Sequence, residues 1–200
     1  RLRKADIMEC KAALGKEPLS VLYASLTQGD ITLTMRSPDG GRVGLCGVAA
    51  HLAGAKKVCI TDGDSELLPL IKRNVKLNIS SYDVYIERLL WGDMDDHRKI
   101  EKDVLSPGIN SNKFDVIFGS DIVACPYVDA LNSLIDTLEY YFDQNPKLVV
   151  YISYKRRNES ENRHFWNVIT ETKGWKTESI NIDLYEDVNE DLFLCKISKF

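Results

Sequence analysis

The sequence predicts an α/β fold: a mostly parallel sheet with helices on both faces and an antiparallel hairpin at its C-terminal end. From Gly44 onwards, short apolar runs alternate with stretches of helical period, which is typical of strands joined by crossover helices. Residues 114–118 are apolar except for Asp115, as expected of a central strand covered on both faces. Residues 175–184 and 192–198 alternate in polarity and flank an acidic turn, which predicts the hairpin.

The composition fits one globular domain. The chain has 200 residues, of which 44% are hydrophobic and 28% charged, so it is long enough to bury a sizeable core. We expect residues 1–36 to form an N-terminal helix and β-hairpin extension, and residues 37–200 to form the main domain. The net charge of −4 argues against a general nucleic-acid binder, which usually carries a basic surface. We also expect a monomer.

Cysteine and histidine usage predicts reduced thiols and no metal site. The five cysteines lack CxxC spacing and three of them sit in apolar runs: Cys10, Cys46, Cys59, Cys125 and Cys195. The three histidines are scattered along the chain. No apolar run is long enough to span a membrane, and the N-terminus lacks the apolar stretch of a signal peptide. We therefore expect an intracellular protein, cytoplasmic with the nucleus as an alternative location.

The N-terminal part is predicted to form a small unit of its own. Residues 1–15 favour a short helix that stops at Gly15. Residues 19–26 and 30–35 are rich in β-formers and are separated by a turn, which predicts a β-hairpin.

The main domain is predicted to alternate helices and strands. Its first half contains a helix over 44–54, a strand over 58–60, a helix from the N-cap Ser65 to Asn78, and a strand over 84–90. Its second half contains a loop with at most one helical turn over 94–112, the strand over 114–118, a helix over 128–142, a strand over 148–152 and a helix over 159–172. Pro69 fits the second helix only in its first turn. The helix over 128–142 is expected to bury Leu131, Leu134, Ile135, Leu138 and Tyr141.

Polar residues at the ends of these strands mark a candidate ligand site, because open α/β sheets bind ligands at the carboxyl ends of their strands. Asp62 follows the strand over 58–60, where a carboxylate can accept hydrogen bonds from both ribose hydroxyls; a solvated turn acid is the alternative. Trp91 and Asp93 follow the next strand, where they can flank an adenine and accept from its amino group. A half-buried core aromatic is the alternative for Trp91.

The strand over 114–118 leads into a second polar group at the same edge. Asp121 is positioned to meet the group that reacts, with a turn or helix-cap acid as the alternative. Tyr127 begins the next helix and can form an aromatic wall beside a cation, or simply pack against the core.

The glycine spacing does not predict a dinucleotide site. Glycines at 40, 41, 44 and 47 do not match the G-x-G-x-x-G pattern that cradles a pyrophosphate. A nucleoside cofactor without a pyrophosphate needs less of that anion-binding geometry.

The ordered motifs resemble those of the seven-β-strand protein lysine methyltransferases of the methyltransferase-like class. The resemblance rests on GLCGVAAHLAGAKKVCITDGD, NVKLN, LLWGD, FDVIFGSDIVACPY and YISYKRR, in that order. It implies a Rossmann-like, class I methyltransferase domain with a seven-stranded sheet that binds S-adenosylmethionine (SAM). It also implies transfer of the methyl group to a protein side chain, most simply a lysine ε-amine of a protein substrate.

The resemblance assigns roles to individual residues. It implies that Asp62 holds the ribose of SAM, and that Gly44, Trp91 and Ser120 line the rest of the cofactor site. It implies that Asp121, the acid of the family's D-x-x-Y motif, lies at the reacting amine together with Tyr127.

Two departures from the family pattern leave alternatives open. Ala124 stands where the motif has tyrosine, so Tyr127 is expected to take over the aromatic role. The family's first strand and its E-L-G-x-G-x-G loop are not recognisable before GLCG, and we expect a piece of chain to be missing between Met35 and Gly44. A non-catalytic module of the same fold is therefore one alternative. A methyltransferase for RNA or a small molecule is another, although no N-P-P-[YF] run follows the fourth strand.

Overall fold

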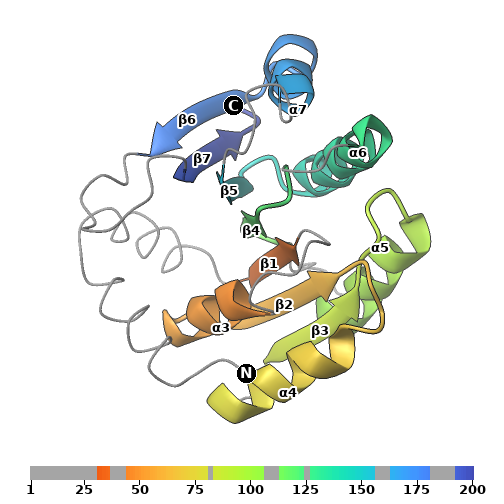
Figure 1. Ribbon diagram of the computed structural model, residues 1–200, viewed down its shortest axis with the longest axis vertical. Coiled ribbons are helices and arrows are strands. Elements are labelled where there is room, and N and C mark those ends of the chain that lie inside the picture. The colour runs from red at the N-terminus through yellow and green to blue at the C-terminus, as the bar shows by residue number, and fades with distance from the viewer. Residues whose placement is uncertain are drawn as a thin grey trace.

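The protein is built around one β-sheet. The computed structural model describes residues 31–36, 44–80, 83–105, 113–123, 127–155, 163–180 and 192–200, and it describes side chains from residue 44 onwards. Within these residues seven strands form a sheet of order β3-β2-β1-β4-β5-β7-β6 (Figure 1). The strands are β1 (Ile31–Arg36), β2 (Lys57–Asp62), β3 (Val84–Arg88), β4 (Val116–Ser120), β5 (Val149–Lys155), β6 (Lys176–Ile180) and β7 (Leu192–Ser198). Strands β1 to β5 pair in parallel, and β7 runs antiparallel to both β5 and β6.

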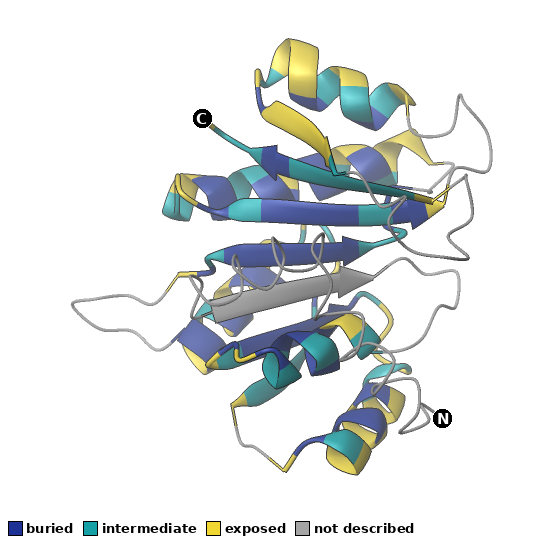
Figure 2. Cartoon of the chain, turned by 90° about the vertical axis from the view of Figure 1, so that its left-hand side faces the viewer, coloured by how far each residue is buried: buried dark blue, intermediate teal, exposed yellow. Residues whose placement is uncertain are grey.

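Helices cover both faces of the sheet. One face carries α3 (Leu45–Leu52) and α4 (Leu68–Asn78). The other carries α5 (Met94–Ile100) with the π-helical turn η1 (Glu101–Leu105), α6 (Val128–Gln144), and α7 (Arg163–Asn167) with the π-helical turn η2 (Val168–Thr172). Figure 2 shows the buried strands between the two layers, with exposed residues on β6 and on the outer sides of the helices.

Two hydrophobic clusters fill the two layers. Because successive side chains of a strand point to opposite faces, Ile60 belongs to the cluster under α3 and α4, whereas its neighbour Cys59 belongs to the cluster under α5, α6 and α7. The inner residues predicted for α6 are confirmed as buried: Leu131, Leu134, Ile135, Leu138 and Tyr141.

Strand β1 corrects the prediction for the N-terminal part. Residues 31–36 lie between β2 and β4 and pair with both in parallel, so the hairpin predicted for residues 30–35 is wrong for this strand. The expected absence of the family's first strand is wrong as well. The physical reason is that a run of β-forming residues predicts a strand but not its neighbours. The hydrogen-bonding partners on both edges of β1 come from segments distant in the sequence. The predicted helix over 1–15, the strand over 19–26 and the loop before Gly44 lie outside the described residues.

Helix α5 corrects the predicted loop over residues 94–112. The carboxylate of Asp93 accepts hydrogen bonds from the amides of Asp95 and Asp96, which is N-capping of the first turn. Ile100, Val104 and Leu105 are buried and give the helical segment an inner side. The sequence analysis overlooked a helix signal here, since acids in the first turn and basic residues in the last turn complement the helix dipole.

Helix α4 begins two residues later than the cap at Ser65 predicts. Its N-cap is Leu67, and Pro69 occupies the first turn, as its missing N–H requires. The residues before it turn through two local hydrogen bonds, from the amide of Asp64 to Asp62 and from the amide of Glu66 to Asp64. No helix in the described part of the chain has the length and hydropathy of a membrane span.

Candidate active site

The carboxyl ends of the parallel strands bring the predicted site residues to one edge of the sheet. Asp62 ends β2 and lies opposite Arg88 at the end of β3. Ser120 ends β4 and lies between the end of β1 and Ser153 of β5. The sequence prediction that these strand ends share an edge is therefore confirmed.

Asp62 is a buried carboxylate at the end of β2. Its side chain accepts a 3.0 Å hydrogen bond from the amide of Asp64, and its carbonyl oxygen accepts one of 3.0 Å from the amide of Leu89. The residue is only 4% exposed, so the alternative interpretation of Asp62 as a solvated turn acid is wrong. A carboxylate accepts up to about four hydrogen bonds, so the bond from Asp64 is compatible with further donors such as ribose hydroxyls.

Gly44 starts α3 in a conformation that favours glycine. Its φ is +83°, and a Cβ built on it would lie 3.2 Å from Cγ2 of Ile71. Its carbonyl oxygen accepts the hydrogen bond from Val48 that opens the helix. Glycine therefore allows the backbone to pack closely against Ile71 of α4.

The turn after β3 presents Leu90 rather than Trp91 to this edge. Trp91 is partly buried against the cluster under α5, α6 and α7, which favours the core packing that the sequence left open for it. Leu90 is 49% exposed, and a Cβ built on Gly63 would lie 3.6 Å from its Cδ1. Since Gly63 directly follows Asp62, Leu90 lies next to the ribose-binding candidate. The sequence analysis missed it because a second leucine in a strand-like run carries no separate signal.

Asp93 caps α5 and does not face a ligand in this arrangement. Its Oδ1 accepts from the amides of Asp95 and Asp96 at 2.9 and 3.3 Å, and its Oδ2 lies 3.5 Å from the guanidinium of Arg88. The two backbone donors, with Arg88 adding to them, hold the pKa of Asp93 below its usual value. The suggestion that Asp93 accepts from an adenine amino group is therefore not supported.

Asp121 adopts a left-handed backbone conformation directly after β4. Its φ of +59° is the only positive value at a non-glycine residue in the described part of the chain. Its amide donates to the carbonyl of Ser153 at 2.7 Å, and its Oδ1 accepts from the amide of Lys155 at 3.3 Å. Strain of this kind concentrates at functional sites, so the observation supports a role for Asp121 beyond that of a turn acid.

Gly119 makes room for this turn. A Cβ built on it would lie 2.3 Å from Cδ1 and 2.9 Å from Cγ1 of Ile122, which is fully buried. The buried pair Ile122 and Val123 anchors the chain immediately after Asp121. The strand end is thus rigid, which suits a residue that has to orient a substrate.

Tyr127 stands at the start of α6 and is 71% exposed. Its carbonyl oxygen accepts the amide of Leu131 at 3.1 Å, so its backbone belongs to the cap of the helix. The alternative that the ring packs into the core is wrong. Ala124 lies outside the described residues, so its place in the D-x-x-Y position stays a sequence observation.

The two candidate carboxylates of the site lie at the ends of different strands. Asp62 ends β2 and Asp121 follows β4, and β1 lies between these two strands. Neighbouring strands lie about 4.8 Å apart, so the ends of β2 and β4 are about 10 Å from each other. A ligand lying across the end of β1 can contact both carboxylates.

Among the described residues, no group of three or more His, Cys, Asp or Glu residues could hold a metal ion.

The family profile of lysine methyltransferases matches residues 40–171. The chain belongs to this family. The yeast protein-lysine N-methyltransferase EFM6 from Saccharomyces cerevisiae is 30% identical over 141 residues, which are 65% of this chain and 52% of the yeast protein. The chain thus matches about half the length of that curated relative.

Solved structures share the fold at low sequence identity. Precorrin-6y C5,15-methyltransferase from Geobacter metallireducens has a TM-score of 0.58 and 12% identity, covering 90% of this chain and 87% of that one. SMU.1697c from Streptococcus mutans, a candidate methyltransferase solved in complex with SAH, has a TM-score of 0.54 and 15% identity, covering 91% and 97%. The fold is therefore the Rossmann-like one of class I methyltransferases.

Proposed function

We propose that this protein transfers a methyl group from SAM to a lysine ε-amine of a protein substrate. The observation that carries the proposal is the pair of acids at one sheet edge, buried Asp62 after β2 and strained Asp121 after β4, in a chain of the lysine methyltransferase family. The name of the yeast relative supports a lysine side chain as the acceptor.

The residues at the edge fit SAM. Asp62 would hold the ribose hydroxyls, and Gly44, at the start of α3, would line the cofactor with its backbone. Leu90 would pack beside the adenine in the place that the sequence suggested for Trp91, and Ser120 would line the adenosine from β4. When bound, SAM supplies an activated methyl group on a sulfonium, so the chain needs no nucleophile of its own.

The chain's contribution to transfer is orientation of the substrate amine. A free lysine has a pKa of about 10.4 and reacts only when neutral. An apolar channel walled by Tyr127 would favour the neutral amine by desolvation. The carboxylate of Asp121 would instead raise the pKa of the amine, so we assign it to orienting the amine by a hydrogen bond and to relaying its proton. Correct placement of the two reacting groups supplies several kcal/mol.

We further propose that the seven described strands are the complete sheet and that the domain begins at or before β1, with the residues before it as an extension. This moves the predicted boundary at residues 36 and 37 upstream, because β1 is hydrogen-bonded inside the sheet.

A monomer in the cytoplasm, with the nucleus as an alternative location, is proposed from the cysteine usage and composition. The acidic net charge supports a protein rather than a nucleic acid as substrate.

Calorimetric titration with SAM tests the cofactor. We expect the wild-type protein to bind and Asp62→Ala to lose binding, because the ribose loses its acceptor. Asp136→Asn is the matched control, since this acid is exposed on α6, away from the strand ends. Unchanged binding in Asp62→Ala would overturn the cofactor assignment.

Incubation of the protein with radiolabelled SAM and a lysate tests the acceptor. We expect label in a protein band that survives nuclease treatment and yields methyl-lysine on hydrolysis. SAM binding with no labelled product would favour the non-catalytic alternative, and label in nucleic acid would favour the RNA alternative.

A further inference from the structure

A tight turn joins β3 to α5 beside the proposed cofactor site. The amide of Asp93 donates to the carbonyl of Leu90 at 3.0 Å, and Gly92 has a φ of +80°, as the third residue of a type II turn requires. The amide of Gly92 donates to the hydroxyl of Thr137, a fully buried residue of α6, at 2.9 Å. The turn is therefore attached to the helix layer at its tip.

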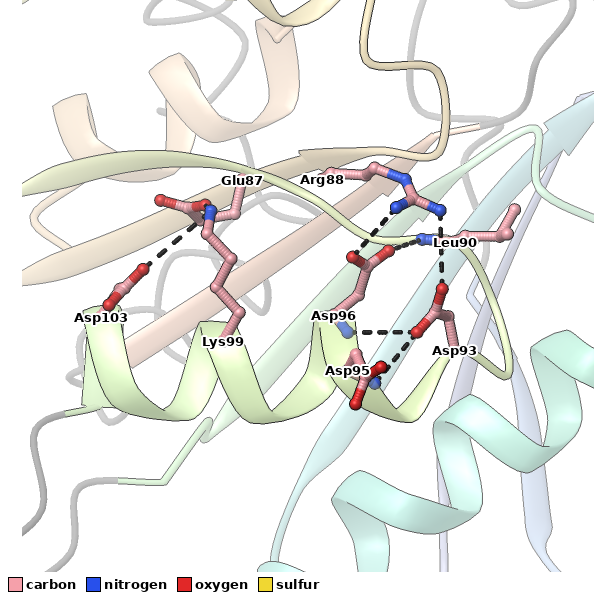
Figure 3. A network of polar contacts seen from close by, with 8 residues as sticks. All are labelled: Glu87, Arg88, Leu90, Asp93, Asp95, Asp96, Lys99 and Asp103. Carbon is pink, nitrogen blue, oxygen red and sulfur yellow. Dashed lines mark hydrogen bonds and ion pairs between the residues drawn. The ribbon is translucent and has the colours of Figure 1, made fainter.

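Arg88, the last residue of β3, clamps the two ends of this turn (Figure 3). Its guanidinium lies 3.4 Å from Oδ1 of Asp96 and 3.5 Å from Oδ2 of Asp93. The second oxygen of Asp96 accepts the amide of Leu90 at 2.8 Å. Arg88 thus holds the end of the turn directly, through Asp93, and its beginning through Asp96.

The clamp is only partly exposed to water. The side chain of Asp96 is 9% exposed and that of Arg88 is 40% exposed. An ion pair with one partner buried in this way is screened less than a fully exposed pair. Removing the carboxylate would also leave the amide of Leu90 without its acceptor, which costs more than the bond itself contributes.

The clamped turn lies directly against the ribose-binding candidate. The amide of Leu89, next to Arg88 in sequence, donates to the carbonyl of Asp62 at 3.0 Å. The side chain of Leu90 lies beside Gly63, the residue after Asp62. We propose that Arg88 and Asp96 are positioning residues that lock the Leu90–Asp93 turn in the shape that packs beside the adenine of SAM. The inference rests on the proposed function for the identity of the cofactor.

Calorimetry with SAM tests the clamp in three variants. We expect the Kd of SAM to rise about tenfold in Asp96→Ala, which loses the hydrogen bond from the amide of Leu90, and in Arg88→Gln, which loses both ion pairs of the clamp. Asp96→Asn should lie between these and the wild type, because its amide oxygen can still accept the amide of Leu90. At saturating SAM, kcat should stay within about twofold of wild type while the KM for SAM rises.

Lys99→Gln is the matched control. Lys99 sits on the same helix and pairs with Glu87 and Asp103, so its loss removes ion pairs from α5 without touching the turn (Figure 3). We expect its Kd for SAM to equal that of the wild type, even where its melting temperature falls as far as that of Arg88→Gln.

Hydrogen exchange in the absence of SAM provides a second readout. We expect the amide of Leu90 to exchange faster in Asp96→Ala than in the wild type or in Lys99→Gln. An unchanged Kd in both Arg88→Gln and Asp96→Ala would overturn the proposal, and so would an equal loss in Lys99→Gln. If the wild type binds no SAM, the proposed function fails, and a faster exchange of Leu90 would then show a clamp with no role in SAM binding.

Discussion

The amide of Lys155 donates a 3.3 Å hydrogen bond to Oδ1 of Asp121. This bond ties the carboxylate that follows β4 to the end of β5, on the side away from β2. The amide of Asp121 in turn donates to Ser153 of the same strand. The two acids of the site are thus held on different strands by different partners, so their roles can be separated by mutation.

Asp121→Ala should separate cofactor binding from transfer. We expect the Kd of SAM to stay within about twofold of wild type, because Asp121 is not among the residues proposed to hold the cofactor, while transfer falls by about a hundredfold or more. Asp121→Asn should retain the backbone conformation, since asparagine also tolerates a positive φ. Calorimetry and single-turnover labelling measure the two quantities. Full transfer activity in Asp121→Ala would remove this residue from the site.

Tyr127→Ala should affect substrate binding without changing stability. The side chain is 71% exposed, so the free energy of unfolding should change by less than about 0.5 kcal/mol. We expect the KM for the protein substrate to rise and the KM for SAM to stay constant, with Tyr127→Phe close to wild type because it keeps the ring. A change confined to the KM for SAM would contradict the proposed aromatic wall.

Gly119→Ala should destabilise the fold. The added Cβ would meet buried Ile122 at 2.3 Å, and overpacking of a filled core costs about 1–3 kcal/mol. Gly63→Ala is the comparison, because its nearest neighbour, the carbonyl oxygen of Leu89, would lie 3.5 Å away in ordinary contact. Urea unfolding of the two variants measures the difference. Equal stability would mean that Ile122 changes rotamer at no cost.

Stability should fall on mild acidification because of His97. The residue is buried, with Nδ1 3.1 Å from the hydroxyl of Tyr141 and its ring 4.4 Å from that of Tyr140. Burial lowers its pKa from the usual 6.5, although the nearby acids, Glu101 first, oppose the shift. The unfolded chain therefore binds a proton before the folded one does, and stability present above about pH 6.5 is lost as the pH falls through that value.

Urea unfolding of wild type and His97→Gln between about pH 7.5 and about pH 5.5 measures this effect. We expect the wild type to lose stability over this range and the variant to lose less. Asp93, whose pKa is lowered from 3.8, adds its own loss only as the pH falls through that value, which lies below the measured range. The same pH slope in both proteins would exclude His97 as the source.

The sequence by itself determined the local features of this protein. Helical spacing in the helix over 128–142 predicted the buried face of α6, because a period of 3.6 residues is a property of the helix alone. The apolar runs predicted β2, β4 and β5 to within a few residues. Because parallel strands share one carboxyl edge, the acids after two of them, Asp62 and Asp121, could be placed together before any contact was known.

Only the tertiary structure decided which distant segments meet. It placed Ile31–Arg36 between β2 and β4, since a strand's partners are not encoded in its own residues. It turned Trp91 toward the core and Leu90 toward Gly63, a choice set by packing against α6. It also joined Arg88 to Asp93 and Asp96 across a turn, an arrangement that depends on how β3 and α5 are oriented and that no spacing rule predicts.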